Sequence, residues 1–193
     1  MLQRLYDWTM GLAGHRRALW VLAAIAFIES SVFPIPPDVL IIPMVLATRA
    51  RAWRIALVAT VASVLGGGLG YLIGAALFET LGRPLLEFYG MMGSFQEFQQ
   101  AYQDNGFVIV FGAGFSPFPY KVITIASGVA GLDPVTFMAA SAVSRTARFF
   151  LVAALLWKFG PPIRVFIEKY LPYLAGAFVI LLIGGFVALR YLF

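Results

Sequence analysis

Apolar residues run along this chain in long uninterrupted stretches. Residues 55–78 and 171–189 carry no charged side chain. A helix that crosses a hydrocarbon core of about 30 Å needs about 20 largely apolar residues. Both segments therefore predict transmembrane helices. Residues 134–157 predict a third span, although this one contains two arginines.

Four shorter apolar runs come in two pairs, and prolines separate the two members of each pair. The prolines are Pro34 and Pro36 between residues 18–28 and 39–48, and Pro117 and Pro119 between residues 105–116 and 122–132. Each run is too short to cross a bilayer, and proline removes a backbone donor that a continuous helix would need. The pattern predicts two re-entrant helical hairpins with their breaks at the prolines.

The two halves of the chain resemble each other in sequence. Residues 33–38 align with residues 116–121, so that both Pro-x-Pro motifs coincide. We interpret this match as an internal repeat. Lysine and arginine in short loops favour the cytoplasmic side, whereas residues 79–104 carry four acids and Arg83 as their one basic residue. This bias predicts opposite orientations for the two repeats, as in transporters whose broken helices meet near the midplane.

The predicted fold is an all-α integral membrane protein forming one membrane domain over residues 1–193. In each half, a proline-broken re-entrant hairpin is followed by a transmembrane helix. The expected parts are an interfacial N-terminal helix (1–17), the first repeat (18–84), an external amphipathic segment (85–104), the second repeat (105–162) and a C-terminal span (163–193). The N-terminus is expected in the cytoplasm.

Composition narrows the function further. The chain is 61% hydrophobic and 12% charged, with a mean hydropathy of +0.88, which is too apolar for a water-facing globule. Its net charge of +5 is explained by basic residues beside membrane segments, so we expect no nucleic-acid partner. Without cysteine and with His15 as the one histidine, we expect no metal site, no cofactor and no catalytic residues. An enzyme is therefore the least favoured class.

Five ionisable side chains nevertheless fall inside the apolar segments: Glu29, Asp38, Lys121, Arg145 and Arg148. Each costs about 2.5 to 3.5 kcal/mol at the centre of a membrane helix, so they must face one another or water. Arg145 and Arg148 share one helix face with Ser141. Asp38 and Lys121 occupy equivalent positions in the two repeats, and we expect them to approach each other if the hairpin tips meet.

Two interpretations of these charges stay open. Three cations and two acids leave a surplus positive charge, which favours an anion bound by Lys121, Arg145 and Arg148, with Asp38 nearby. Glu29 and Asp38 are then candidates for proton coupling. Alternatively, the charges form buried structural ion pairs, or the hairpins are shallow enough for Asp38 and Lys121 to reach lipid headgroups.

Small and hydroxylated residues have a simpler expected role. Gly66, Gly70 and Gly74 recur every four residues, which predicts a helix face that another backbone approaches closely. The hydroxyls of Ser116, Thr124 and Ser127 are expected to satisfy backbone groups freed near the second break.

The proline motifs also carry a resemblance to a known family. Glu29, residues 33–38, residues 115–121, Gly128, Phe137 and Arg145 together resemble the DedA superfamily, also called the VTT or SNARE-associated domain family, and in particular its YqaA-like branch. The resemblance covers residues 27–160. It implies that Glu29 and Asp38 are the essential acids. Gly114 stands where many members have arginine, and Arg145 and Arg148 are candidates to replace that basic residue.

The resemblance implies a lipid-moving protein of the bacterial inner (plasma) membrane. We expect a flippase or scramblase for a phosphate-bearing lipid such as a phospholipid or polyprenyl phosphate, with proton coupling as an option. Membrane lipids with anionic phosphate headgroups, and protons, are the expected partners, and a homo-oligomer stays open. The alternatives are a proton-coupled transporter of a small soluble solute and a membrane-organising protein that transports nothing.

Overall fold

The computed structural model describes residues 17–32, 36–116 and 119–160, and these residues form helices joined by short turns. The helices are α2 (Ala18–Ser31), α3 (Asp38–Ala47), the 3-10 turn η1 (Arg49–Arg51), α4 (Ala52–Leu77), the π-helical turn η2 (Phe78–Gly82), α5 (Arg83–Phe88), α6 (Met92–Phe115), α7 (Tyr120–Val129) and α8 (Pro134–Phe159). The all-α prediction is confirmed for the described part of the chain.

Two of these helices are long and apolar enough to cross a membrane, and both were predicted. α4 continues through η2 and α5 without a break in the helical backbone, over Arg49–Phe88. α8 is 26 residues long. α8 begins where Asp133 accepts a hydrogen bond from the backbone N–H of Thr136, and it ends at Gly160, whose φ is +65°. The predicted span at 171–189 and most of the predicted interfacial helix at 1–17 lie outside the described residues.

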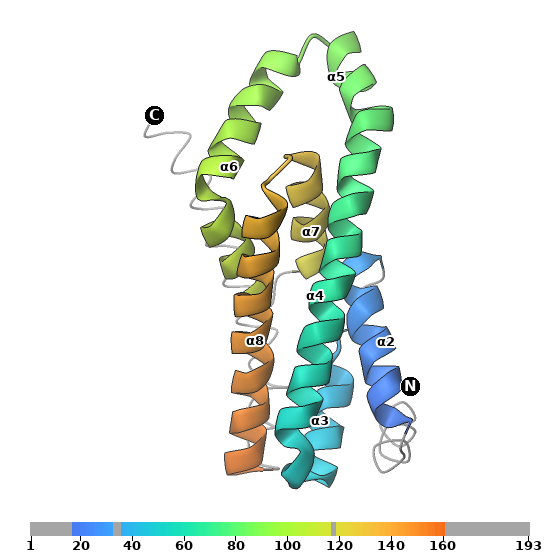
Figure 1. Cartoon of the computed structure of the whole chain (residues 1–193), viewed down its shortest axis with the longest axis vertical. Coiled ribbons are helices and arrows are strands. Elements are labelled where there is room, and N and C mark those ends of the chain that lie inside the picture. The colour runs from blue at the N-terminus through green and yellow to red at the C-terminus, as the bar shows by residue number, and fades with distance from the viewer. Residues whose placement is uncertain (1–16, 33–35, 117–118, 161–193) are drawn as a thin grey trace.

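One helix precedes and another follows each proline motif. α2 rises to the middle of the molecule and α3 returns toward the same end, whereas α6 descends from the opposite end and α7 turns back (Figure 1). The two breaks lie close together, because Thr124 on α7 donates to the backbone oxygen of Ser30 on α2 at 3.1 Å. The membrane re-entry of these hairpins and their descent from a repeat stay predictions.

One helix end differs from the expected division of the chain. α6 runs unbroken from Met92 to Phe115, across the expected boundary at residues 104 and 105. The side chain of Asn105 donates a hydrogen bond to the backbone oxygen of Ala101 within the same helix, and Gly106 packs against Leu132. The polar stretch is therefore held inside the helix instead of ending it.

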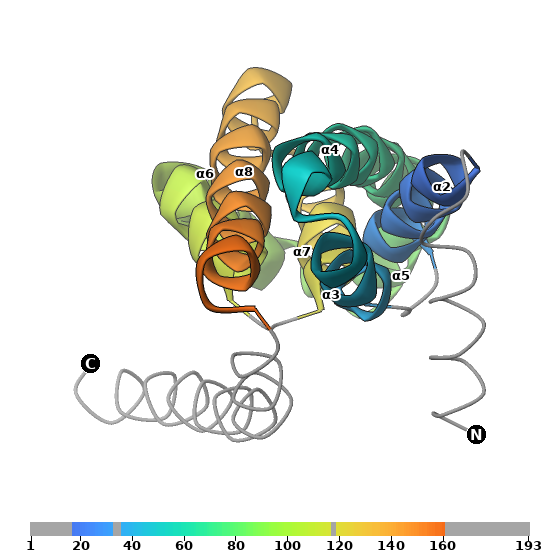
Figure 2. The same cartoon turned by 90° about the horizontal axis from the view of Figure 1, so that it is seen from below.

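α4 is the central helix of the bundle and lies between α2 and α8 when the molecule is viewed along its long axis (Figure 2). Its glycine face makes this possible. A Cβ at Gly66 would overlap the backbone of Phe27 on α2, and one at Gly74 would overlap the backbone of Ile125 on α7. A Cβ at Gly70 would overlap the side chain of Thr124. The predicted close-packing face is confirmed.

Large apolar side chains cover the outside of the bundle. Trp20 on α2 is 78% exposed, Leu72 on α4 is 63% exposed and Val108 on α6 is 70% exposed. Further exposed apolar residues on α4 are Leu57, Val61, Leu65 and Leu69. A water-soluble monomer rarely exposes contiguous apolar area on this scale, so these faces fit a hydrocarbon environment.

Candidate functional site

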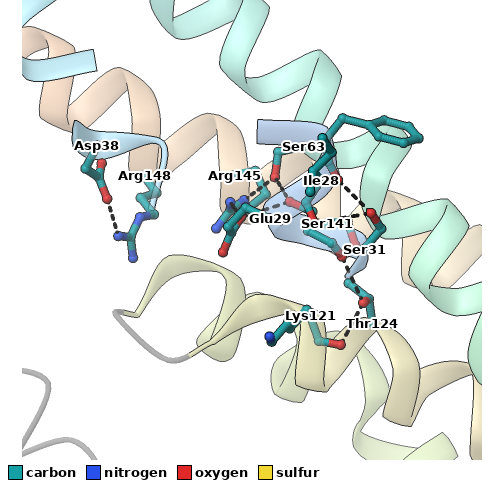
Figure 3. A network of polar contacts seen from close by, with 12 residues as sticks. Ile28, Glu29, Ser31, Asp38, Ser63, Lys121, Thr124, Ser141, Arg145 and Arg148 are labelled. Carbon is teal, nitrogen blue, oxygen red and sulfur yellow. Dashed lines mark hydrogen bonds and ion pairs between the residues drawn. The ribbon is translucent and has the colours of Figure 1, made fainter. Parts of the chain in front are cut away.

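The charges that sequence analysis singled out gather where the two helix breaks meet. Four of the five form two ion pairs that join α8 to the first hairpin, and the fifth lies across from them on α7 (Figure 3). Arg145 and Arg148 lie one turn apart on α8, so that one reaches α2 and the other reaches the start of α3. The prediction that these charges face one another is confirmed for these two pairs.

The inner pair is the more deeply buried of the two. Arg145 Nη2 lies 2.9 Å from Glu29 Oε2, and the side chains are 3% and 13% exposed. Arg145 Nε donates to the Ser63 hydroxyl at 2.6 Å, and this oxygen lies 2.6 Å from the Ser30 hydroxyl. Ser30 in turn donates to Glu29. The network links three helices and gives each buried charge several polar partners, as burial of charge requires.

Two aromatic rings pack against the same guanidinium group. The Cζ atom of Arg145 lies 4.5 Å from the ring centroid of Tyr120 and 4.6 Å from that of Phe149. Glycines make room for the tyrosine, since a Cβ at Gly67 would lie 3.2 Å from the Tyr120 ring and hydroxyl. These cation–π contacts fix the plane of the guanidinium group.

The outer pair is less completely satisfied. Arg148 Nη2 lies 2.8 Å from Asp38 Oδ2, and Arg148 Nη1 donates to the backbone oxygen of Ser116. Asp38 Oδ1 and Arg148 Nε are buried but have no hydrogen-bond partner among the described residues. Arg148 therefore ties α3 to the end of α6 and still has one donor to offer.

The expected approach of Asp38 to Lys121 was wrong. Asp38 pairs with Arg148 (Figure 3). Lys121 Nζ instead donates to the backbone oxygen of Val32 at 3.4 Å. The two residues do occupy matching first-turn positions, on α3 and α7. Their helices pack against different neighbours, however: α3 contacts α8, whereas the start of α7 meets the end of α2. Their matching positions in the predicted repeat therefore did not determine the directions of their side chains.

The proline motifs directly precede the two short helices at the site. Pro36 and Pro119 are exposed, and α3 and α7 begin within two residues of them. Pro34 and Pro117 lie outside the described residues. Because the first backbone N–H groups of a helix lack partners within the helix, both helix starts bring positive partial charge to the site.

Two of the three hydroxyl groups near the second break behave as predicted. Ser116 Oγ donates to the backbone oxygen of Ala113, Thr124 Oγ1 lies within hydrogen-bond distance of the backbone oxygens of Lys121 and Ser30, and Ser127 Oγ donates to the backbone oxygen of Ile123. The expectation that these side chains satisfy freed backbone groups is confirmed for Ser116 and Thr124, because Ala113 and Ser30 each have a proline four residues later. Ser127 instead bonds a carbonyl inside α7.

Sequence analysis missed three residues of the site, namely Ser30, Ser63 and Tyr120. Ser63 lies one turn before Gly66 on the close-packing face of α4, and Ser30 adjoins Glu29, so both positions carried a signal. Tyr120 follows the second Pro-x-Pro motif, and its hydroxyl is buried without a partner among the described residues. The sequence did not show that an arginine of α8 packs against its ring.

The arrangement combines three cations, two carboxylates and two helix starts inside an apolar bundle. The ion pairs leave Lys121 as the surplus cation of this group, and the helix starts add to the positive potential. Such a site suits an anion, and phosphate is well matched by the planar fork of arginine.

Comparisons with known proteins agree with the fold. The VTT domain matches residues 35–158. The chain is 39% identical to an uncharacterized protein of Haemophilus influenzae over 168 residues, covering 85% of this chain and 87% of the relative. It is 34% identical to an uncharacterized protein of Histophilus somni over 186 residues, covering 96% of this chain and 97% of that relative. No solved structure matches the chain. The chain therefore belongs to the VTT domain family of membrane proteins.

Proposed function

We propose that this protein translocates a lipid with a phosphate headgroup across the bacterial inner membrane, and that it belongs to the YqaA-like branch of its family. The supporting observation is the charged cluster at the meeting point of two helix breaks. Ionisable residues inside membrane segments are costly and mark substrate or ion pathways. Broken helices whose starts face one point provide a site for anionic groups.

The proposed membrane placement makes the two helix pairs re-entrant hairpins of opposite orientation. Arg49, Arg51 and Arg54 lie at the end of the molecule where α3 meets α4, which fits a cytoplasmic surface. Glu79 and Glu87 lie toward the other end, on η2 and α5. In this placement the N-terminus is cytoplasmic and the breaks meet inside the bilayer.

The charges divide into binding and coupling roles in this proposal. Lys121, Arg145 and Arg148 attract the phosphate group, with Asp38 beside it, while the acyl or prenyl chain stays in the surrounding lipid. Glu29 and Asp38 are the groups whose protonation would change the net charge of the site.

The test is headgroup-labelled lipid exchange between the leaflets of liposomes that contain the purified protein. Arg148→Ala is expected to reduce the exchange rate at least tenfold while the protein still inserts, and Glu29→Gln is expected to remove any dependence on a pH gradient. Arg83→Ala is the matched control, since Arg83 forms an exposed pair with Glu79 far from the breaks. Full exchange by Arg148→Ala, or none by the wild type, would refute the proposal.

A membrane-organising role is the second candidate. It is favoured by the inner pair, in which Arg145 already has hydrogen-bond and aromatic partners within the protein. Arg145 has a polar partner at Nε and at Nη2 and packs against two aromatic rings, as expected of a structural contact. In that case charge removal lowers the unfolding temperature and the biological activity in parallel, with no lipid exchange by the wild type. Uptake of a soluble solute without lipid exchange would instead favour a solute transporter.

A further inference from the structure

We propose that the two ion pairs do different work: Arg148, Asp38 and Lys121 contact the transported headgroup, whereas Arg145 and Glu29 hold the helices in place. This inference rests on the proposed lipid transport and narrows its binding site to the outer pair. It removes Arg145 from the groups that touch the ligand.

The inner pair has little left to offer a ligand. Arg145 is 2% exposed, Ser63 and Glu29 occupy its Nε and Nη2, and the rings of Tyr120 and Phe149 lie 4.5 and 4.6 Å from its Cζ atom. A phosphate group could reach it only after two rings and one carboxylate had moved. The same contacts connect α2, α4, α7 and α8, which is the role of a structural clamp.

The outer pair has unused hydrogen-bonding capacity of both kinds. Arg148 Nε is a buried donor and Asp38 Oδ1 is a buried acceptor, and neither has a partner among the described residues. A buried polar group without a partner carries a desolvation cost that a ligand can relieve. Lys121 Nζ has three N–H groups, and among the described residues it makes one long contact, at 3.4 Å, to the backbone oxygen of Val32.

These unused groups specify the chemistry of the ligand. Arg148 Nε and Lys121 Nζ require an acceptor, which a phosphate oxygen supplies. Asp38 Oδ1 requires a hydrogen-bond donor on the same ligand, because a carboxylate oxygen only accepts. The site therefore takes a phosphate ester whose headgroup also carries an N–H or O–H group. A phosphocholine headgroup lacks such a donor.

Equilibrium binding of two soluble short-chain lipids to the full-length protein in detergent tests this assignment. Dihexanoyl phosphatidylethanolamine and dihexanoyl phosphatidylcholine have equal net charge and equal tails, but only the first has N–H donors. We expect the ethanolamine lipid to bind about tenfold more tightly, which corresponds to one satisfied hydrogen bond. Equal affinities, or no binding of either lipid, would overturn the inference.

Two conservative substitutions separate the roles of the arginines. Arg148→Lys keeps a charge beside Asp38 but removes Nε and the contact to Ser116, so we expect about tenfold weaker binding and a smaller fall in unfolding temperature than Arg145→Lys causes. Arg145→Lys removes the stacked plane and the contact to Ser63, so we expect a lower unfolding temperature and unchanged affinity in the folded fraction. If Arg145→Lys does not fold, Ser63→Ala provides the milder disruption of the same network. Weakened binding by the inner-pair variant without loss by Arg148→Lys would overturn the division.

The binding experiment can fail independently of the proposed function. Lipid exchange in liposomes together with equal binding of the two headgroups leaves transport standing and removes the outer-pair assignment. Selective binding without exchange leaves the assignment standing and removes the transport proposal.

Discussion

Arg145 is tolerated inside an apolar bundle because its guanidinium group has hydrogen-bond and aromatic partners. Tyr120, which packs against its guanidinium group, has an unusual feature, since its hydroxyl is fully buried and meets the Ser141 hydroxyl without forming a well-aligned hydrogen bond. The ring of Tyr120 and its hydroxyl should therefore affect stability in opposite directions.

Substitutions at Tyr120 separate these two contributions. Tyr120→Phe keeps the ring over Arg145 and removes a buried unpaired hydroxyl, so the free energy of unfolding should stay equal or rise by about 1 kcal/mol. Tyr120→Leu removes the cation–π contact and ring volume, and should lower the free energy of unfolding by about 2 kcal/mol or more. Thermal unfolding of the detergent-solubilised protein, followed by intrinsic fluorescence, measures both.

The two variants also test the hydroxyl itself. If Tyr120→Phe were as destabilising as Tyr120→Leu, the hydroxyl would have to make a hydrogen bond that stabilises the native state. That result would contradict the contact pattern around this residue.

The identity of the charged residues was readable from the sequence, but their pairing was not. Glu29, Asp38, Arg145 and Arg148 stood out because charge is expensive in apolar segments. Which acid meets which base depends on the rotation of α3 and α7 about their axes, and each of these helices is only 10 residues long. α3 is buried nearly all round, so it has no polar face to reveal its rotation.

The glycine face of α4 brings α2 and α7 close enough for the charged groups to meet. Gly66→Ala should lower the free energy of unfolding by about 1 to 3 kcal/mol, because the added Cβ would overlap the backbone of Phe27, which cannot move independently. If α2 and α4 moved apart at this point, the distance between the Ser63 and Ser30 hydroxyls would also increase.

Gly112→Ala on α6 is the matched control for this substitution. A Cβ at Gly112 meets nothing within 4 Å, so only the helix preference of alanine remains, which is worth about 0.5 to 1 kcal/mol in favour of the variant. Unfolding temperatures of the two variants should therefore move in opposite directions. A shift of the same sign in both would rule out the close-packing explanation.

The start of α8 is set by Asp133, whose carboxylate accepts from the backbone N–H and the hydroxyl of Thr136. These hydrogen bonds hold the pKa of Asp133 below its ordinary value of 3.8. A lowered folded-state pKa means that the cap stabilises the protein fully above the unfolded-state pKa, and that this stabilisation is lost as the pH falls through the folded-state pKa.

Asp133→Asn provides the comparison, because its amide oxygen can still accept but does not titrate. The difference in unfolding temperature between wild type and variant should be constant at neutral pH and should shrink below about pH 4. Subtraction of the two curves removes the contribution of the other acids. A difference that stays constant down to about pH 2 would show that the cap does not titrate in this range.

Helix existence was easier to predict than helix ends. The spans at 55–78 and 134–157 were found because length and uniform apolarity suffice for such a prediction. The continuity of α6 was missed because Asp104, Asn105 and Gly106 look like a break when side-chain contacts are unknown. The side chain of Asn105 donates a hydrogen bond within its own helix, and the absence of a side chain at Gly106 leaves room for Leu132. Neither contact is visible in the sequence.

The whole molecule places its turns at two ends and its helix breaks in the middle. The connections between α3 and α4, and between α4 and α6, lie at opposite ends, and α7 turns back toward the end where α5 meets α6 (Figure 1). If the second helix pair re-enters the membrane, Asp133 before α8 must lie on the same side as Ser94 near the start of α6. If α6 and α7 instead formed one complete crossing, these residues would lie on opposite sides.

Because the chain contains no cysteine, single substitutions can report this topology without a background signal. Ser94→Cys and Asp133→Cys should both react with a membrane-impermeant maleimide added to intact cells with a permeable outer envelope. Arg51→Cys and Lys158→Cys should react only after the membrane is opened, because both residues lie at the end assigned to the cytoplasm. All four side chains are exposed in the structure, so a lack of reaction reflects membrane sidedness rather than burial. Labelling of Ser94→Cys without labelling of Asp133→Cys would mean a complete crossing. It would separate the two helix breaks across the bilayer and remove the physical basis for a shared site at its midplane.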